Sequence, residues 1–591
     1  MGDRMIITIG EGTCGIAAGS KEAADLLSKR FPEAELRSVG CVGMCHQEPM
    51  VWITNTDDVT TLYGQVNKKN LPKIVRHIKG EGDAPPNFIS TSQQPDTDKG
   101  RYLTGQTRIA LRNVGTINPT SLEQALARGT YGAIKKILTS GMTPEAVIEE
   151  VKISQLRGRG GGGFPTATKW GFARSAPGEV KYLICNGDEG DPGAFMDRSL
   201  LEGDPHAVLE GMLIAAYGIG ASRGYAYIRA EYPLAVQYFG KAIQDARAAG
   251  LLGKNILGTS FAFDIKIKEG AGAFVCGEET ALMASIEGHR GMPRIRPPFP
   301  AISGLFGKPT IINNVETLAN LPWILNHGGA AYAAIGTEKS KGTKVFALAG
   351  AVARGGLVEV PMGSTIRHVI EEIGGGSAKG RPLKGVQLGG PSGGCVPEAM
   401  FDTLIDYDAI NATGAIMGSG GMVVMDSKTC MVDISRYFLE FTQLESCGKC
   451  TFCRIGTLRM KEILTRICEG KGTMADIETL EELGPQIKNA SLCGLGQTAP
   501  NPVLTTLKYF RDEYIAHVVD KKCPGGVCKA LIQHTIVQDK CTGCSICARY
   551  CPVNCISGEL KKPETWVIDS KVCINCGMCA EVCNPEAVFV A

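Results

Sequence analysis

The spacing of hydrophobic positions changes several times along the chain, and each change predicts a different kind of element. Residues 5–80 show the patterns of strand, helix, strand, loop, strand and helix, with the first helix at 20–31. Over 343–376 apolar and polar residues first alternate, as in short strands, and then recur at helical spacing. Residues 457–470 and 474–490 carry apolar side chains three and four positions apart, which predicts two amphipathic helices. No run approaches the 18 apolar residues of a membrane span.

Length and composition predict a cytoplasmic protein with several domains. A chain of 591 residues exceeds what one hydrophobic core usually supports. Its 62 basic and 60 acidic residues nearly cancel, which argues against nucleic acid or an acidic membrane surface as a partner. The N-terminal residues lack the order of a signal peptide. In a reducing cytoplasm, 23 cysteines indicate metal ligands and not disulfides.

Two cysteine runs near the C-terminus have the spacing of iron–sulfur ligands. In Cys-x2-Cys-x2-Cys-x3-Cys-Pro, three thiolates surround one cluster and the fourth belongs to a second cluster. Zinc is the alternative, but zinc sites use pairs of cysteines and not triplets that cross over. Cys555 is expected to be a small core residue. The two runs therefore predict a ferredoxin domain with two [4Fe–4S] clusters, one held by Cys541, Cys544, Cys547 and Cys583 and the other by Cys551, Cys573, Cys576 and Cys579.

A third [4Fe–4S] cluster and a zinc ion are predicted upstream. The triplet Cys447, Cys450 and Cys453 lies before the two amphipathic helices, and a remote Cys493 follows them. Three cysteines and one histidine that remain suit a tetrahedral structural zinc, although buried thiols and a surface histidine are the alternative. This predicted zinc set is Cys468, Cys523, Cys528 and His534.

A glycine-rich segment at 158–170 has the composition of a phosphate-binding loop. Gly158, Gly160 and Gly163 match G-x-G-x-x-G, but a helical pattern at 143–156 precedes them, and a Rossmann turn would require a strand there. The glycines nevertheless let backbone N–H groups approach a phosphate, and Arg159 and Lys169 add positive charge.

Three further segments carry polar side chains at loops. An acidic stretch at 186–193 suits either magnesium or the hydroxyl and amide groups of a nucleotide. Glu278 and Glu279 lie where a glycine-rich loop leads into a helix. The third group consists of Arg296, Phe299, Asn313 and Asn314. Taken singly, each segment is better explained as a structural loop.

As an ordered set, these motifs resemble the flavin- and NADH-binding subunit of respiratory complex I. They are more similar still to the diaphorase subunits of multimeric and electron-bifurcating hydrogenases, and the resemblance covers essentially the whole chain. It implies FMN contacts from Arg159, Gly160, Gly162, Lys169, Asn186, Asp188, Glu189, Gly277, Glu278, Asn313 and Asn314. It implies NAD(P) contacts from Phe164, Phe172, Asp191, Phe274, Glu279, Arg296 and Phe299. Three positions depart from the family pattern: Asp191 replaces glutamate, Phe274 replaces tyrosine and Arg296 replaces lysine.

The resemblance implies a multidomain α/β and α+β fold. The expected order is a thioredoxin-like domain at 1–80, a mobile linker at 81–105, an FMN- and NAD(P)-binding domain at 106–338 and an SLBB β-grasp domain at 339–430, followed by a helical [4Fe–4S] bundle at 431–515, a zinc connector at 516–536 and the ferredoxin domain at 537–591. Cys185, Cys276, Cys395 and Cys430 are expected to be buried thiols.

The implied activity is NAD(P)H:acceptor oxidoreduction. FMN would exchange hydride with NAD(P)(H) and pass single electrons through the clusters, so no side chain need transfer a proton. The implied partners are a small [2Fe–2S] thioredoxin-like subunit and a catalytic subunit of hydrogenase or formate dehydrogenase type. Bifurcation with ferredoxin is a further property of some relatives. The alternatives are the complex I subunit itself and a non-catalytic relay or scaffold.

The N-terminal domain has three of the four cysteines that related domains use for a [2Fe–2S] cluster, namely Cys14, Cys41 and Cys45. The fourth would lie about five residues before Cys14, where this chain has Ile9 and Gly10. His46 is a candidate substitute, and a docking domain without a cluster is the alternative.

Overall fold

The computed structural model describes residues 4–590, which divide into two compact units. The first comprises the chain up to 380 together with 386–393 and 398–424, and the second comprises 381–385, 394–397 and the chain from 425. Within the described range, no helix is long and apolar enough to cross a membrane.

The N-terminal domain has the predicted thioredoxin-like fold. Its mixed sheet has the order β2-β1-β3-β4-β5, in which β1 runs parallel to β2 and antiparallel to β3. Ile7, Leu27 and Ile74 belong to its core, because alternate strand residues and one face of each helix point inward. The elements are β1 (Ile6–Gly10), α1 (Thr13–Ala18), α2 (Ser20–Arg30), β2 (Glu35–Val39), η1 (Cys45–Gln47), β3 (Val51–Thr54), β4 (Thr60–Tyr63), α3 (Leu71–Ile78) and β5 (Phe88–Thr91).

The segment expected to be a mobile linker, 81–105, is instead ordered. It contributes β5, which pairs with β4, and the short helix α4 (Arg101–Thr104). Tyr102 is fully buried, and its hydroxyl donates to the carbonyl of Leu357 at 3.1 Å. The burial of Tyr102 and the pairing of β5 with β4 fix this segment on the domain. The polar composition of 81–105 predicted neither contact.

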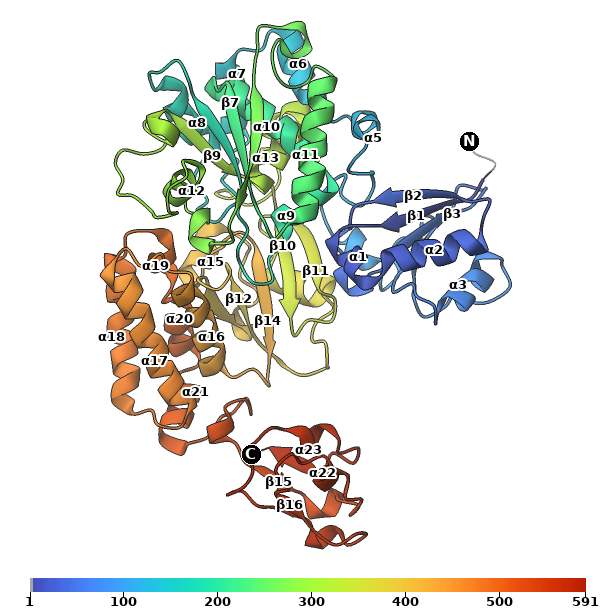
Figure 1. Ribbon diagram of the computed structural model, residues 1–591, viewed down its shortest axis with the longest axis vertical. Coiled ribbons are helices and arrows are strands. Elements are labelled where there is room, and N and C mark those ends of the chain that lie inside the picture. Colours follow the sequence, from blue (N-terminus) through green and yellow to red (C-terminus); the bar gives the residue numbers. More distant parts are fainter. Residues whose placement is uncertain (1–3, 591) are drawn as a thin grey trace. The chain divides into compact units, whose positions relative to one another are not determined.

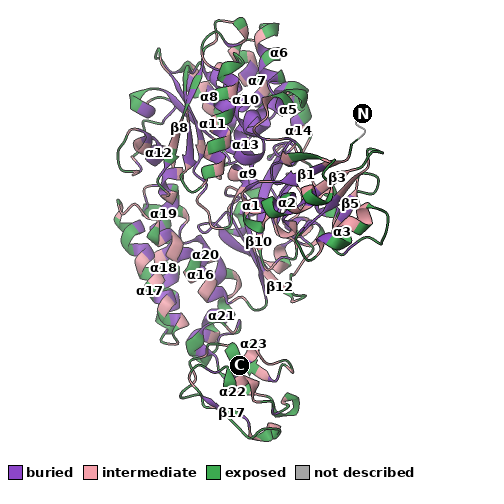
Figure 2. Ribbon diagram, turned by 45° about the vertical axis from the view of Figure 1, so that its right-hand side comes forward, coloured by how far each residue is buried: buried purple, intermediate pink, exposed green. Residues whose placement is uncertain are grey.

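The central domain is built on a parallel sheet with the order β8-β7-β6-β9. In Figure 1 its strands lie among α8, α10, α11 and α13. Helix α10 is buried on almost every side, as its nearly continuous apolar sequence requires, and Figure 2 shows it in the colour of buried residues. The elements are α5 (Leu122–Ala127), α6 (Gly132–Ser140), α7 (Pro144–Ile153), α8 (Thr166–Ser175), β6 (Tyr182–Gly187), α9 (Met196–Gly203), α10 (Pro205–Ile219), β7 (Arg223–Arg229), α11 (Pro233–Ala248), β8 (Asp264–Gly270), η3 (Phe274–Gly277), α12 (Glu279–Ile286), β9 (Thr310–Asn314), α13 (Val315–His327) and α14 (Gly329–Ala333).

A five-stranded mixed sheet with the order β11-β10-β14-β12-β13 follows. Strand β10 runs antiparallel to β11 and parallel to β14. The alternating pattern at 343–376 therefore did predict strands, and the helical part forms the wide turn His368–Ile373. The elements are β10 (Thr343–Gly350), β11 (Gly356–Pro361), β12 (Leu383–Leu388), β13 (Gly394–Pro397), α15 (Tyr407–Thr413) and β14 (Gly421–Asp426).

The second unit contains a helical bundle and a small β-rich C-terminal part. The two predicted amphipathic helices are confirmed as α17 and α18, and a capping box of Thr473 and Asp476 begins α18. Two short antiparallel ribbons, β15–β18 and β16–β17, carry the cysteine runs. The elements are α16 (Met431–Leu444), α17 (Thr457–Cys468), α18 (Met474–Ala490), α19 (Gly494–Thr498), α20 (Asn501–Tyr509), α21 (Arg511–Ile515), β15 (His534–Ile536), α22 (Ile546–Arg549), β16 (Ile556–Ser557), β17 (Val567–Ile568), α23 (Met578–Glu581) and β18 (Val588–Val590).

Candidate functional site

The predicted cofactor residues gather at the carboxyl edge of the parallel sheet. Strand β6 ends at Asn186 and Gly187 and continues into the acidic loop, while β9 ends at Asn313 and Asn314. Strand β8 leads through a glycine-rich turn to Glu278. Parallel strands end at the same edge, and ligands of open α/β sheets bind outside that edge. Segments more than 100 residues apart in sequence therefore reach one region.

The glycine-rich loop between α7 and α8 comes close to this edge. A Cβ atom added at Gly160 would lie 2.9 Å from the Cβ of Asn314, and one at Gly163 would lie 2.6 Å from the ring of Tyr407. A Cβ at Gly162 would meet no atom within 4 Å. The loop thus packs tightly on one side and leaves its backbone open on the other, as a phosphate-binding loop requires. A helix and not a strand precedes it, in agreement with the sequence.

Lys169, Glu279 and Arg296 form a charged group beside the loop. The Lys169 ammonium pairs with the Glu279 carboxylate and donates to the carbonyl of Ile312 at 2.8 Å. The Arg296 guanidinium lies 3.9 Å from the other oxygen of Glu279. Glu279 is thus held between two cations, which fixes its orientation at the first residue of α12.

The acidic loop after β6 is partly buried. Asn186 donates to the carbonyl of Gly277 at 3.0 Å and so joins this loop to the one before α12. Glu189 accepts from the N–H groups of Asp197 and Arg198, both at 3.1 Å, at the start of α9. Burial raises the pKa of Asp191 to about 7, and its carboxylate accepts from the Ser419 hydroxyl at 2.9 Å.

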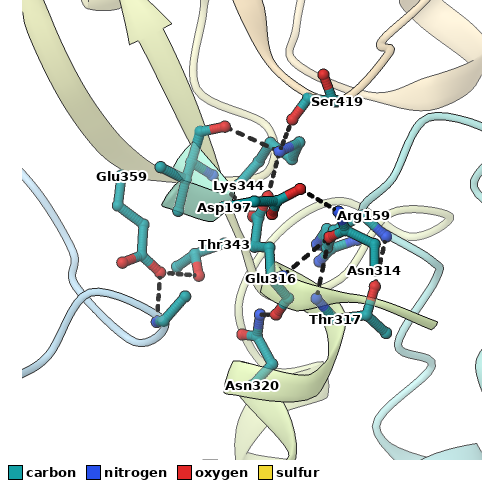
Figure 3. Close-up of polar contacts among 12 residues, drawn as sticks. Arg159, Asp197, Asn314, Glu316, Thr317, Asn320, Thr343, Lys344, Glu359 and Ser419 are labelled. Carbon is teal, nitrogen blue, oxygen red and sulfur yellow. Dashed lines mark hydrogen bonds and ion pairs between the residues drawn. The ribbon is translucent and has the colours of Figure 1, made fainter. Parts of the chain in front are cut away.

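A buried network of hydrogen bonds and one ion pair holds Asn314 and the start of α13 in position next to the site. Figure 3 shows the Lys344 ammonium between the Glu316 carboxylate and the carbonyl of Ser419, to which it donates at 2.5 Å. Asn314 donates to the Asp197 carboxylate at 2.6 Å and accepts from the N–H groups that begin α13. Burial raises the pKa of both Glu316 and Asp197. The sequence offered no signal for Lys344, which comes from β10.

Several predicted FMN residues use their side chains within the protein. Arg159 is fully buried and donates to the carbonyls of Arg157 and Lys341 and to the hydroxyl of Tyr332, so its guanidinium binds chain atoms and not a solvent-accessible phosphate. Glu278 caps α12 by accepting from the N–H groups of residues 280 and 281. Asn313 accepts from the Trp170 indole at 2.9 Å. Because these side chains are bonded within the protein, they fix the conformation of the loops. The loop backbone atoms then remain available to contact a ligand.

Three of the four aromatic residues predicted to contact the nucleotide are exposed. Phe164, Phe172 and Phe299 retain 52%, 54% and 56% of their accessible surface, and Phe274 is half-buried. Exposed phenyl rings are costly in water, and their positions around the loops suit stacking on planar rings of a ligand. Gly277 and Asp188 lie next to each other, because a Cβ at Gly277 would come within 3.5 Å of the Asp188 carbonyl.

The cysteine sets are brought together as predicted from spacing. Burial raises the pKa of Cys453 to about 11, and the neighbouring thiols of Cys447, Cys450 and Cys493 add to this shift. In the C-terminal part, one cavity is lined by Cys541, Cys544, Cys547 and Cys583. A second is lined by Cys551, Cys573, Cys576 and Cys579, together with Cys555 and His534. Cys555 is buried, and its sulfur lies 3.4 Å from that of Cys551.

The predicted zinc set needs correction. Cys523 and Cys528 lie with Cys430 and His517, and the four donor atoms are all within 4.8 Å of one another. The Cys430 sulfur is 3.3 Å from Nε2 of His517, whose Nδ1 is bonded to the carbonyl of Glu513 at 2.7 Å. Cys430 had been expected to be only a buried thiol.

Two members of the predicted set lie outside this group. His534 is part of β15, where Nδ1 contacts the Asn575 amide oxygen at 3.1 Å, because pairing with β18 places this residue in the ferredoxin part. Cys468, at the end of α17, hydrogen-bonds the Cys528 thiol from the edge of the group. The separation of six residues between His517 and Cys523 was the available sequence signal.

The three N-terminal thiols also lie together. The Cys45 thiol hydrogen-bonds Cys14, whose pKa it lowers to about 7, and it also contacts Cys41. Beside them, Nδ1 of His46 is bonded to the carbonyl of Gly355 at 2.9 Å, and its ring packs against Tyr102. Because this bond occupies only Nδ1, the suggestion that His46 replaces the absent cysteine stays a prediction.

Comparison with known proteins supports this arrangement. Four family models match: the Nuo51 FMN-binding domain at 151–323, the SLBB domain at 345–396, the NADH-ubiquinone oxidoreductase-F iron-sulfur binding region at 433–517 and a 4Fe-4S dicluster domain at 540–587. Over 459 residues the chain is 58% identical to NADP-reducing hydrogenase subunit HndC of Solidesulfovibrio fructosivorans, covering 78% of this chain and 93% of that protein. The chain belongs to the Nuo51 family of FMN-binding subunits.

One further sequence relative and one solved structure are also similar to this chain. An NADH-quinone oxidoreductase subunit of Rhizobium meliloti is 46% identical over 416 residues, which cover 70% of this chain and 99% of that protein. The crystal structure of an NAD+-reducing [NiFe]-hydrogenase in the H2-reduced state aligns with a TM-score of 0.62 and 30% identity, over 87% of this chain and 84% of that chain. This member of the family is accordingly an NAD(P)H oxidoreductase subunit with an FMN domain and [4Fe–4S] domains.

Proposed function

We propose that this chain is the diaphorase subunit of a hydrogenase-type complex, in which it exchanges electrons between NAD(P)(H) and a catalytic partner subunit. The observation that carries the proposal is the convergence of three loops at the carboxyl edge of the parallel sheet: the glycine-rich loop before α8, the acidic loop after β6 and the turn before α12. The hydrogenase-type partner is inferred from the names of the relatives. A small [2Fe–2S] thioredoxin-like subunit and ferredoxin remain predicted partners. The cytoplasm remains the predicted location of the complex.

Different residues of the loops are suited to bind the FMN phosphate and the nicotinamide nucleotide. The open backbone at Gly162 and the tight approach of Gly160 to Asn314 suit an FMN phosphate on the glycine-rich loop. The exposed rings of Phe164 and Phe172 suit stacking of the nicotinamide nucleotide. When bound, FMN supplies two-electron chemistry with the nicotinamide and one-electron chemistry with the clusters.

Positioning and electrostatics are what the chain itself contributes. Lys169 and Arg296 hold Glu279 in one orientation, so its carboxylate can accept hydrogen bonds from a ligand amide without rearranging. Asp191, with a pKa of about 7, can donate a hydrogen bond when protonated and accept one when ionised. None of these roles requires proton transfer to the substrate.

A direct test combines flavin quantification with dye reduction by the isolated chain under anaerobic conditions. We expect one bound FMN per chain and viologen reduction driven by NADH or NADPH, and the comparison of the two nucleotides shows which is used. Glu279→Gln should lower kcat/KM while flavin remains bound. Glu123→Gln, on the exposed surface of α5, is the matched control and should behave as wild type. If flavin binds but neither nucleotide reduces the dye, the chain is a relay and not a diaphorase.

We also infer a structural zinc ion at Cys430, His517, Cys523 and Cys528. Three thiols and one imidazole match the donor set of structural zinc sites. The hydrogen bond from Nδ1 of His517 to a backbone carbonyl leaves Nε2 to face the sulfurs, as is usual for zinc-bound histidines, whose other ring nitrogen donates to a carbonyl or carboxylate.

A further inference from the structure

The N-terminal domain contains a buried carboxylate that no other part of the proposed function uses. Glu48 follows η1 and retains only 9% of its accessible surface. Its Oε2 accepts from the N–H of Met50 at 3.1 Å, whereas Oε1 has no hydrogen-bond partner among the described residues. A buried carboxylate oxygen without a partner is costly, so a cation or donor absent from the chain itself is indicated.

This carboxylate lies with the three thiols of the two cysteine loops. The Cys41 thiol interacts with the Glu48 carboxylate, and the Cys45 thiol contacts both Cys41 and Cys14. The four side chains therefore form a continuous set of donors. Three thiols and one carboxylate are the number of protein ligands that a two-iron cluster needs, two for each iron.

The Glu48 carboxylate lies where the side chain of a fourth cysteine, at Gly10, would extend. A Cβ atom added at Gly10 would lie 3.7 and 3.8 Å from the two carboxylate oxygens of Glu48. A cysteine sulfur extended from that Cβ would enter the space that the carboxylate occupies. Gly10 is the end of β1, next to the place where the sequence lacks a cysteine.

Positive and hydrogen-bonding groups face the sulfurs. The Arg198 guanidinium, from α9 of the flavin domain, donates to the Cys14 sulfur at 3.5 Å, and the N–H of Gly43 donates to the Cys41 sulfur at 3.3 Å. Thr13 is bonded to Glu202 of the same helix through both its N–H and its hydroxyl. N–H donors and a cation beside thiolates stabilise the anionic form that binds metal.

We propose that Glu48 is the fourth protein ligand of a two-iron iron–sulfur cluster held by Cys14, Cys41 and Cys45. None of the four ligands is a residue predicted to contact flavin or nucleotide, so the site can be tested independently of diaphorase activity. It would lie against α9, whose first turn also carries Asp197 of the buried network.

The test uses the full chain, reconstituted anaerobically with iron and sulfide, and compares iron content with the electron paramagnetic resonance of the reduced protein. Wild type should show the slowly relaxing signal of a two-iron cluster in addition to the [4Fe–4S] signals. Glu48→Gln keeps an oxygen to accept from Met50 and should preserve the fold, but should lose about two irons per chain or shift the g values of this signal.

A gain-of-ligand variant makes the test specific. In Gly10→Cys combined with Glu48→Ala, removal of the carboxylate leaves room for the new sulfur, and the new Cβ meets only ordinary contacts, the nearest at 3.6 Å from Trp52, so the cluster should return with altered g values. Glu11→Gln is the matched control, because Glu11 lies next to Gly10 before α1 but its carboxylate accepts from Ser38. Circular dichroism and thermal unfolding verify the fold of each variant.

Two outcomes would overturn the proposal. One is a Glu48→Gln chain whose iron content, g values and midpoint potential equal those of wild type, because the fourth ligand must then be another group. The other is a wild-type chain without the two-iron signal, in which Cys14, Cys41 and Cys45 react as free thiols or form a disulfide after reconstitution.

Discussion

Replacing Gly160 by alanine tests the cofactor loop at its tightest point. The new Cβ would lie 2.9 Å from the Cβ and 3.4 Å from the Cγ of Asn314. Since carbon atoms prefer separations of about 3.5–4.0 Å, the loop or Asn314 must move by roughly 0.6 Å or more. Asn314 cannot move freely, because it caps α13 and donates to Asp197. Overpacking of this kind costs about 1–3 kcal/mol.

This cost should appear in both stability and cofactor binding. A shift of the loop displaces the backbone that faces the phosphate, and each ~1.4 kcal/mol lost from the bound form weakens affinity about tenfold. Gly162→Ala separates the two effects: no atom lies within 4 Å of its Cβ, so stability should be unchanged while FMN affinity falls. Gly171→Ala, inside α8 with equal space, is the control and should be neutral or slightly stabilising, by about 0.5–1 kcal/mol.

The assay is titration of the deflavinated chain with FMN, followed by flavin fluorescence, together with thermal unfolding of the same samples. We expect Gly160→Ala to unfold at lower temperature and bind FMN about tenfold or more weakly than wild type. Wild-type unfolding and affinity in Gly160→Ala would refute the reasoning from close packing. Wild-type affinity in Gly162→Ala would show that the phosphate does not lie on this loop.

Three further predictions follow from buried groups. Lys344→Met leaves the Glu316 carboxylate buried and unpaired and should destabilise the chain by about 3–5 kcal/mol in thermal or denaturant unfolding, whereas adding Glu316→Gln should restore most of the loss. The pKa of Asp191 is raised from 3.8 to about 7, so the folded state holds more protons than the unfolded state between these pH values. The free energy of unfolding of the flavin-free chain should therefore fall as the pH rises from about 4 to about 7, and Asp191→Asn should make this fall less steep. An unchanged pH dependence in Asp191→Asn would contradict the assignment. His517→Ala should lose about one zinc per chain by metal analysis, whereas His534→Ala should retain it, and the reverse result would restore the set expected from the sequence.

Local spacing was sufficient to group the cysteines that are predicted to bind [4Fe–4S] clusters. Three cysteines separated by two residues each lie within one seven-residue stretch, so the triplet at Cys541 could be recognised without a structure. Its remote partner Cys583 followed from the symmetry of the two runs, and both line one cavity. Helical periodicity was equally local, and α17 and α18 lie where it predicted them.

The zinc group and the buried network depended on tertiary contacts. Cys430 and His517 are 87 residues apart along the chain, and only the packing of α16 against the segment after α21 brings their donor atoms to 3.3 Å. Lys344 reaches Glu316 across two domains of the first unit in the same manner. No spacing rule applies to pairs of this kind, because the intervening chain does not constrain their distance.

The sequence by itself determined the family, the order of the domains' motifs and the grouping of the cysteines predicted to bind clusters, because each motif consists of residues close together in the chain. The tertiary structure alone decided which side chains remain for ligands. It assigned Arg159 to the interior, used Glu278 as a helix cap, bonded Nδ1 of His46 to the Gly355 carbonyl and placed Glu48 beside the Cys41 thiol. These outcomes depend on which polar groups burial leaves without a partner, and burial is a property of the folded chain and not of its local sequence.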